Sequence, residues 1–130
     1  MGSNPTPATM KILVLDDMEE RQKWFADKLP KYVDNPEIFV AKDVDEAIKC
    51  FQEINEFDIM FLDHDLGGRI YVDSNDPNTG YQVAKYMVEN GIKGKEIIIH
   101  TLNYAGAQNM MALLPDAKYV PFTSLYSRMV

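Results

Sequence analysis

The stretch that most constrains the fold runs from Phe57 to Gly68 and reads FDIMFLDHDLGG. It contains four consecutive apolar residues, 59–62, a pattern typical of a strand that is buried on both faces of a parallel sheet. Asp63, His64 and Asp65 follow directly, and two glycines then open the backbone. Two carboxylates and an imidazole are therefore expected at the carboxyl end of a core strand, where open α/β sheets bind their ligands.

The composition indicates a single domain with a hydrophobic core. The chain has 130 residues, of which 46% are hydrophobic, and this is enough for one core and too little for two. The net charge of −7 would repel a phosphate backbone, so bulk nucleic-acid binding is not expected. Cys50, the single cysteine, cannot form an internal disulfide, which favours a structural thiol in a reducing, cytoplasmic compartment.

The two ends of the domain are predicted from composition as well. Residues 1–10, MGSNPTPATM, have neither a basic start nor an apolar core, as in an expression tag or a disordered leader. One domain is expected over residues 11–130. No segment is apolar for long enough to span a membrane, so no membrane partner is expected.

Strands and helices are expected to alternate along the chain. The expected strands are 12–15, 38–41, 57–62, 97–99 and 119–120, and the expected helices are 17–29, 43–51, 79–90 and 103–114. Asp17, Asp43 and Thr79 each begin a spacing typical of an N-terminal capping box, Asn103 can cap the helix over 103–114, and Pro30 is expected to end the first helix. Residues 69–78 predict a long loop, with a small hairpin as an option, and loops of this length are often functional.

This alternation predicts an α/β fold, namely a flavodoxin-like open parallel sheet of five strands in the order 2-1-3-4-5. The first and third strands are then neighbours, so Asp16, Asp17 and Asp63 converge in one crevice beside His100 and Thr101. Carboxylates this close raise one another's pKa or require a cation. Oxygen ligands at strand ends suit Mg²⁺, so the sequence predicts a magnesium site.

Four motifs in this order, ILVLDD, FDIMFLD, IIIHT and YVPF, resemble the receiver domain of two-component response regulators. The resemblance implies that Asp16 and Asp17 bind Mg²⁺, that Asp63 ligates the same metal and accepts a phosphoryl group, and that Thr101 reports phosphorylation. It also implies that the metal contacts the backbone carbonyl of Asp65. The residue types suit phosphoryl transfer, which needs a nucleophile and cations beside the equatorial oxygens.

Three features depart from the receiver pattern. Val120 stands where receivers carry the lysine that pairs with the phosphoryl group, and Arg69 is a better substitute than Lys118, which lies too far back on its strand. The loop over 69–78 is an insertion of roughly nine residues relative to the short loops usual in α/β units. The last helix is expected to be truncated, because few residues follow Phe122.

These departures, with the sequence DHDLGG, resemble a divergent receiver branch predicted to process cyclic phosphates at nucleic-acid or nucleotide ends. In such a site His64 and His100 would act as general acid or base. Each candidate also has a structural alternative: Asp17 as a helix cap, Asp65 as the start of a turn, and both histidines as hydrogen-bonded structural residues.

Three classes of function are consistent with these residues. The first is a stand-alone phospho-accepting receiver, whose partner would be a histidine kinase or another signalling protein. The second is a Mg²⁺-dependent phosphoesterase that acts on cyclic or terminal phosphates of a nucleotide or RNA end. The third is a pseudo-receiver that keeps the fold for protein binding. The apolar tail, residues 125–130, would either pack on the sheet or form a homodimer.

Overall fold

The apolar runs of the sequence form a five-stranded parallel sheet. In the computed structural model, which describes residues 8–129, the strands are β1 (Met10–Leu15), β2 (Pro36–Ala41), β3 (Glu56–Leu62), β4 (Lys93–Ile99) and β5 (Lys118–Tyr119). Their order is β2-β1-β3-β4-β5, with every neighbouring pair parallel. The predicted flavodoxin-like fold is therefore confirmed. The predicted leader, 1–10, lies outside the described residues except at its end, where Met10 begins β1.

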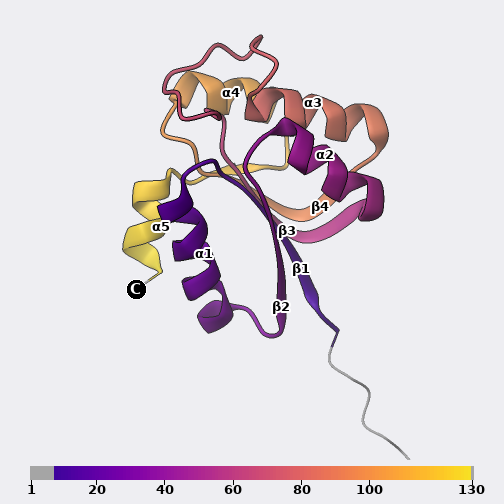
Figure 1. Ribbon diagram of the computed structural model, residues 1–130, viewed down its shortest axis with the longest axis vertical. Helices are drawn as coiled ribbons and strands as arrows, with labels where there is room; N and C mark the ends of the chain where they lie inside the picture. Colours follow the sequence, from indigo (N-terminus) through magenta and orange to yellow (C-terminus); the bar gives the residue numbers. More distant parts are fainter. Residues whose placement is uncertain (1–7, 130) are drawn as a thin grey trace, which may run out of the picture.

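Helices cover both faces of this sheet (Figure 1). They are α1 (Glu19–Tyr32), α2 (Val44–Glu53), α3 (Gly80–Asn90), α4 (Tyr104–Leu113) and α5 (Phe122–Arg128). Figure 1 shows α1 and α5 on one side and the other three helices on the opposite side. Two apolar clusters correspond to these two faces, and none of the described helices is both long and apolar enough to cross a membrane.

The last helix is short, as predicted, but it closes the core beside α1. Leu125 of α5 is buried in one cluster with Phe25 and Leu29 of α1 and with Phe61 of β3. Burying apolar side chains of this size stabilises the fold by about 1.5–3 kcal/mol each. The apolar tail therefore packs within its own chain over the described residues.

Two of the predicted helix caps form and two do not. The side chains of Asp43 and Asn103 accept hydrogen bonds from the amides of Glu46 and Gly106, at 2.9 and 3.0 Å. The prediction for Asp17 is wrong, because α1 begins after Met18 and the Asp17 carboxylate is bound elsewhere.

Thr79 precedes α3 but caps no amide of it, because its hydroxyl donates to the carbonyls of Ser74 and Asp76 in the preceding loop. Pro30 does not end α1, which continues to Tyr32. Only one backbone hydrogen bond is lost at a proline, and here the loss falls in the last turn of the helix.

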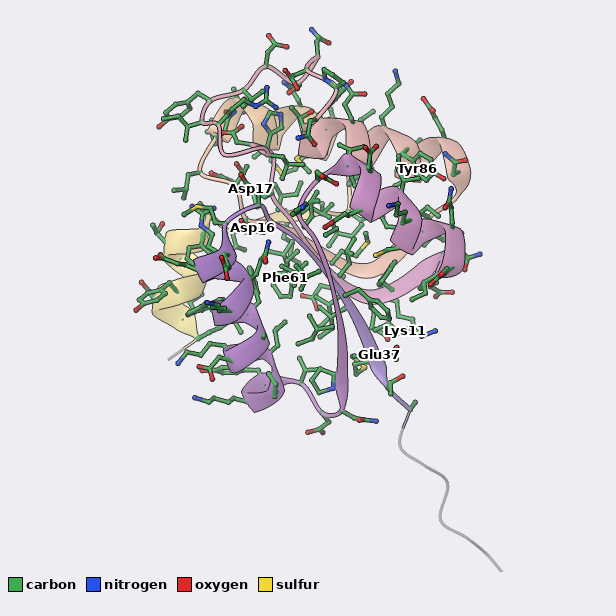
Figure 2. The ribbon with its side chains drawn as sticks, in the orientation of Figure 1. Lys11, Asp16, Asp17, Glu37, Phe61 and Tyr86 are labelled. Atoms are coloured by element: carbon green, nitrogen blue, oxygen red, sulfur yellow. The ribbon has the colours of Figure 1, made fainter. Side chains whose placement is uncertain are left out.

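The register of the sheet places the ends of three strands level with one another. Leu15 of β1 pairs with Leu62 of β3, which pairs with Ile99 of β4. The residues that follow, Asp16, Asp63 and His100, therefore meet at one edge. Figure 2 shows Asp16 and Asp17 at this carboxyl edge, and Lys11 and Glu37 toward the opposite end of the sheet.

Candidate functional site

Asp16, Asp63 and His100 form a buried cluster at the carboxyl edge of the sheet. Their exposed fractions are 0%, 3% and 0%, and each offers a ligand atom within 4.8 Å of the others. His100 Nε2 lies 2.8 Å from Asp16 Oδ2, so the proton of this contact belongs to Nε2, because a carboxylate only accepts. His100 Nδ1 is buried and has no hydrogen-bond partner among the described residues. His100 therefore fixes the position of the Asp16 carboxylate through this hydrogen bond.

The carboxyl group of Asp63 is the group whose pKa is most clearly raised. Burial raises the pKa of Asp63 to about 6, and the Asp16 carboxylate beside it acts in the same direction. His100, Arg21 and the backbone amide of His64 partly offset this effect. That amide, at 2.8 Å from Oδ1, is the single hydrogen-bond donor to Asp63 within residues 8–129. A carboxylate with so few donors has a strong affinity for a cation or for a proton.

A cavity of about 470 Å³ opens above this cluster. It is lined by Asp17, Met18, Arg21, Asp63, Asp65, Gly68, Arg69, Ile70, Tyr71, Thr101, Leu102 and Asn103. Of the predicted site residues, Asp17, Asp63, Asp65 and Thr101 thus reach the cavity, whereas Asp16 and the two histidines do not line it. The lining therefore combines carboxylates, a buried hydroxyl and apolar side chains.

Asp17 and Thr101 are both held by backbone amides. Asp17 Oδ2 accepts a hydrogen bond of 2.5 Å from the amide of Gly68, which fixes the start of the long loop to the end of β1. Thr101 Oγ1 accepts a hydrogen bond of 3.1 Å from the amide of Asn103, and Thr101 is 1% exposed. The hydroxyl of Thr101 therefore keeps its own proton available for a group in the cavity.

His64 points away from Asp63 and into a network that anchors the loop 69–78. Its Nδ1 lies 2.7 Å from Asp65 Oδ1, and its Nε2 lies 2.9 Å from Ser74 Oγ. Asn109 of α4 donates to the same serine oxygen at 2.9 Å. The imidazole thus joins the end of β3 to the loop and to α4, which corresponds to the structural alternative expected for it.

Asp65 is the centre of this network. Its carboxylate accepts hydrogen bonds from His64 Nδ1, from Asn103 Nδ2 and from the amides of Tyr71 and Val72. Although partial burial raises the pKa of Asp65, these four hydrogen bonds outweigh it and hold the pKa below its usual value. Asp65 also makes an isolated antiparallel bridge with Thr79, and the loop between them forms no longer hairpin.

Two glycines permit this close arrangement. A Cβ atom at Gly80 would clash with the backbone carbonyl of Asp63, and a Cβ atom at Gly106 would lie 2.5 Å from the ring of His64. The first turn of α3 therefore rests directly on the end of β3, and α4 rests on the imidazole. These contacts fix the backbone at Asp63 and His64 from the side of α3 and the ring of His64 from the side of α4.

Arg21 is the residue of the site that the sequence reading missed. Its guanidinium nitrogen Nη1 lies 3.7 Å from Asp16 Oδ2 and 3.7 Å from Asp63 Oδ2. Its signal in the sequence was weak but present: it lies four residues after Asp17, one turn into a helix that starts at the carboxyl edge. Arg69, the predicted substitute for the lysine, also lines the cavity, but its guanidinium pairs with both carboxylate oxygens of Asp76.

The cluster fits a divalent cation. Asp16 and Asp63 provide two carboxylate ligands within reach of a single ion, and the third group of the cluster, His100, is engaged through Nε2 in the hydrogen bond to Asp16. Carboxylate oxygens suit both Mg²⁺ and Mn²⁺. Asp17 does not belong to this group of three, because its carboxylate is turned toward Gly68.

Comparison with solved structures gives the same fold, with 28 matching chains. The phosphorylated cyanobacterial phytochrome response regulator RcpA matches with a TM-score of 0.69 and 15% identity, over 94% of this chain and 86% of that one. The Mg(2+)-BeF complex of the response regulator TrrA from Thermotoga maritima matches with a TM-score of 0.62 and 21% identity, over 92% and 98%. The Mn(2+)-bound response regulator Rcp1 matches with a TM-score of 0.63 and 15% identity, over 86% and 80%.

Sequence comparison identifies the branch of this fold. A search of curated proteins found no match. The family model of the cyclic-phosphate processing receiver domain, in contrast, matches residues 11–116, which include every strand end of the carboxyl edge except that of β5. Together with the β2-β1-β3-β4-β5 sheet and its buried acidic cluster, this match shows that the chain belongs to the family of cyclic-phosphate processing receiver domains.

Proposed function

We propose that the crevice binds a phosphate ester beside a divalent cation and opens a cyclic phosphate by hydrolysis, with Asp63 as the reacting carboxyl group. The observation that carries this proposal is the position of Asp63. It is buried against Asp16, it has one hydrogen-bond donor, and it forms part of the lining of the 470 Å³ cavity. The match to the cyclic-phosphate processing family supports the choice of substrate class.

The residues proposed to hold the cation are Asp16 and Asp63, with Mg²⁺ or Mn²⁺ as the ion and with His100 as the residue that positions Asp16. A divalent cation bound there would neutralise the oxygens of a phosphate group and increase the electrophilicity of its phosphorus. The chain itself supplies the orientation of these ligands. The 2.8 Å bond from His100 fixes Asp16, and the contact with α3 at Gly80 fixes the backbone of Asp63.

Hydrolysis of a cyclic phosphate consumes one water molecule. A P–O bond forms to the water oxygen, one P–O bond of the ring breaks, and a proton moves from the water to the departing alkoxide. Asp63 suits this proton transfer, because its carboxylate lines the cavity and has one hydrogen-bond donor among the described residues. The carboxylate accepts the proton from the water and the carboxyl group then returns it to the alkoxide. Thr101 can donate a hydrogen bond to a phosphate oxygen.

A second candidate function is phosphorylation of Asp63 itself. It is favoured by one observation, namely that Asp63 and Thr101 line the same cavity on neighbouring strands, as acceptor and reporting hydroxyl would. In that reaction a carboxylate oxygen of Asp63 bonds to the phosphorus of a donor, and the donor group leaves with its own oxygen. A histidine kinase or another signalling protein would then be the partner.

One experiment tests both reactions. The protein is incubated with Mg²⁺ or Mn²⁺ and, separately, with a 2′,3′-cyclic nucleotide or acetyl phosphate, and Asp63→Ala is the control. Chromatography detects a ring-opened nucleotide monophosphate, and intact mass detects a covalent phosphoryl group.

We expect ring opening that requires both the cation and Asp63. A stable phosphate-sized mass gain without ring opening would replace the first function by the second. Absence of both products over a range of cyclic phosphates and donors would contradict both functions and favour a pseudo-receiver that binds protein.

A further inference from the structure

The crevice contains one positively charged side chain that is largely buried. Arg21 projects from the first turn of α1, its side chain is 16% exposed, and it lines the cavity beside Asp63. Its guanidinium lies at the same distance, 3.7 Å, from Asp16 and from Asp63. It therefore sits between the carboxylates and the space where a ligand would bind.

The guanidinium of Arg21 is positioned by an aromatic ring rather than by hydrogen bonds. Its Cζ atom lies 4.9 Å from the centre of the Phe122 ring at the start of α5. This is within the range of a cation–π contact, which arginine forms readily because its guanidinium is flat. At 3.7 Å the two carboxylate contacts are longer than charge-assisted hydrogen bonds, which measure about 2.7–2.9 Å. Within residues 8–129 no hydrogen bond thus occupies the N–H donors of Arg21, so they can turn toward a ligand.

The other basic side chains near the crevice are already engaged. Arg69 donates to Asp76 at 2.8 and 3.1 Å and also to backbone carbonyls of the loop. Lys118 lies on β5, is largely exposed and pairs with Glu96. Val120, at the position where receivers carry a lysine, is half-buried and packs in the apolar cluster with Phe122. The basic side chain of the crevice therefore comes from α1, whereas the end of β5 carries the apolar Val120.

We infer that Arg21 is the residue that binds the phosphate group, in place of the lysine at the end of β5. This inference rests on the proposed function, since it assigns a residue to the same crevice. A guanidinium matches two oxygens of a phosphate at once, which a lysine ammonium cannot do. Three carboxylates, those of Asp16, Asp17 and Asp63, surround the site and would repel a phosphate anion. Arg21 offsets this repulsion, together with a divalent cation.

The test measures phosphate binding rather than turnover. The probe is inorganic phosphate in the presence of Mg²⁺, and binding is measured by titration calorimetry and by the rise of Tm with phosphate concentration. The variants are Arg21→Gln, Arg21→Lys and the double variant Arg21→Gln with Val120→Lys. The matched control is Arg69→Gln, which removes the second arginine of the cavity. Circular dichroism in the absence of phosphate checks that each variant is folded.

We expect Arg21→Gln to weaken phosphate binding by at least about tenfold, because one charge-assisted contact is lost. Arg21→Lys should retain part of the affinity, and Val120→Lys should restore part of it in the Arg21→Gln background. Arg69→Gln should change the affinity by less than about threefold, because its guanidinium is bound to Asp76.

Two results would overturn the inference, and they are distinguishable. If the wild-type protein binds phosphate and Arg21→Gln binds it equally well, or if Arg69→Gln causes the larger loss, then Arg21 is not the phosphate-binding residue, while the proposed function stands. If the wild-type protein binds no phosphate with Mg²⁺ or with Mn²⁺, then the phosphate site and the inference that depends on it both fail. Should Arg21→Gln not fold, Arg21→Lys and Phe122→Leu provide the same comparison, each with an expected loss of about threefold.

Discussion

The motif DHD contributes two carboxylates, and the structure treats them in opposite ways. Asp63 accepts one hydrogen bond and lies against a second carboxylate, whereas Asp65, two residues later, accepts four hydrogen bonds. Burial raises the pKa of Asp63, and hydrogen bonding lowers the pKa of Asp65. Although the two residues are only two positions apart, the chain provides hydrogen-bond donors to Asp65 and few to Asp63.

This difference distinguishes a carboxylate that is available to a ligand from one that stabilises the fold. A carboxylate whose acceptor sites are filled by the chain stabilises the fold and has little left to offer a ligand. A buried carboxylate with few donors costs stability, and a cation or a substrate can relieve that cost. The loop 69–78 is therefore held in place by Asp65, and Asp63 is the carboxylate that is left available to a ligand in the crevice.

The largest effect is expected from replacing each of the two carboxylates in turn and comparing the reaction rates. Asp63→Asn should lower the rate of cyclic-phosphate opening by about 10²–10⁴-fold, because the amide cannot accept the proton of the water. Asp65→Asn, in contrast, should leave most of the rate at a temperature where the variant is folded. Initial rates at saturating substrate check this expectation. Equal losses in the two variants would show that the carboxylates act as one unit.

The second prediction concerns stability. Asp65→Ala removes the acceptor of four donors and should lower the free energy of unfolding by about 2–3 kcal/mol. Urea denaturation followed by circular dichroism measures this loss. The matched control is Asp73→Ala, which removes an exposed carboxylate of the same loop that accepts a hydrogen bond from the amide of Asn75, and should leave the free energy of unfolding almost unchanged. A similar loss in both variants would contradict the central role of Asp65.

The third prediction uses pH to compare the same two groups. The folded-state pKa of Asp63, about 6, lies above its ordinary value of 3.8, so its contribution to stability is present at low pH and lost as pH rises through about 6. In EDTA, Asp63→Asn should therefore gain on the order of 2 kcal/mol relative to wild type between pH 4.5 and pH 7.5. For Asp65, whose pKa is lowered, the contribution to stability is present above the ordinary pKa of 3.8 and is lost as pH falls below that value and through the lowered pKa. A Tm difference between Asp63→Asn and wild type that is independent of pH would contradict the raised pKa of Asp63.

The smallest expected effect is that of Gly106→Ala on the support for His64. The added methyl group would press on the imidazole from 2.5 Å and should cost about 1–2 kcal/mol. Ala105→Ser, at the exposed neighbouring position, is the control. Thermal unfolding of the two variants measures the difference. If Gly106→Ala were as stable as the control, α4 would not rest tightly on His64.

Most of the fold was predictable from local patterns. The apolar runs, their spacing and the alternation with helices predicted the strand order, and strand order alone predicted that Asp16, Asp63 and Thr101 would meet at one edge. The caps at Asp43 and Asn103 were also predictable, because each involves an amide three residues away. Interactions of this kind are contained within a few residues of sequence.

The remaining features depend on partners that are distant in the sequence. Asp17 binds the amide of Gly68, 51 residues away, rather than its own helix. The direction of the His64 side chain depends on Ser74 and on α4, and the place of Arg21 depends on the ring of Phe122. No local rule gives these pairings, so neither the place of Arg21 in the crevice nor the role of His64 in anchoring the loop could be predicted from the sequence.

The contact of Gly80 with the carbonyl of Asp63 has a consequence for how this chain can vary. Together with the bridge between Asp65 and Thr79, it joins the two ends of the long connection, so that the residues between them leave and re-enter the domain at almost one point. The entropic cost of closing such a segment rises by only about 0.6 kcal/mol for each doubling of its length. Insertions should therefore be tolerated at little cost in stability where they leave the amides of Tyr71 and Val72 and the side chain of Ser74 in place, because these groups hold the loop. Residues 75–78, which do not line the crevice, are the part of the loop at which this scaffold could acquire a new recognition element or accept an engineered one.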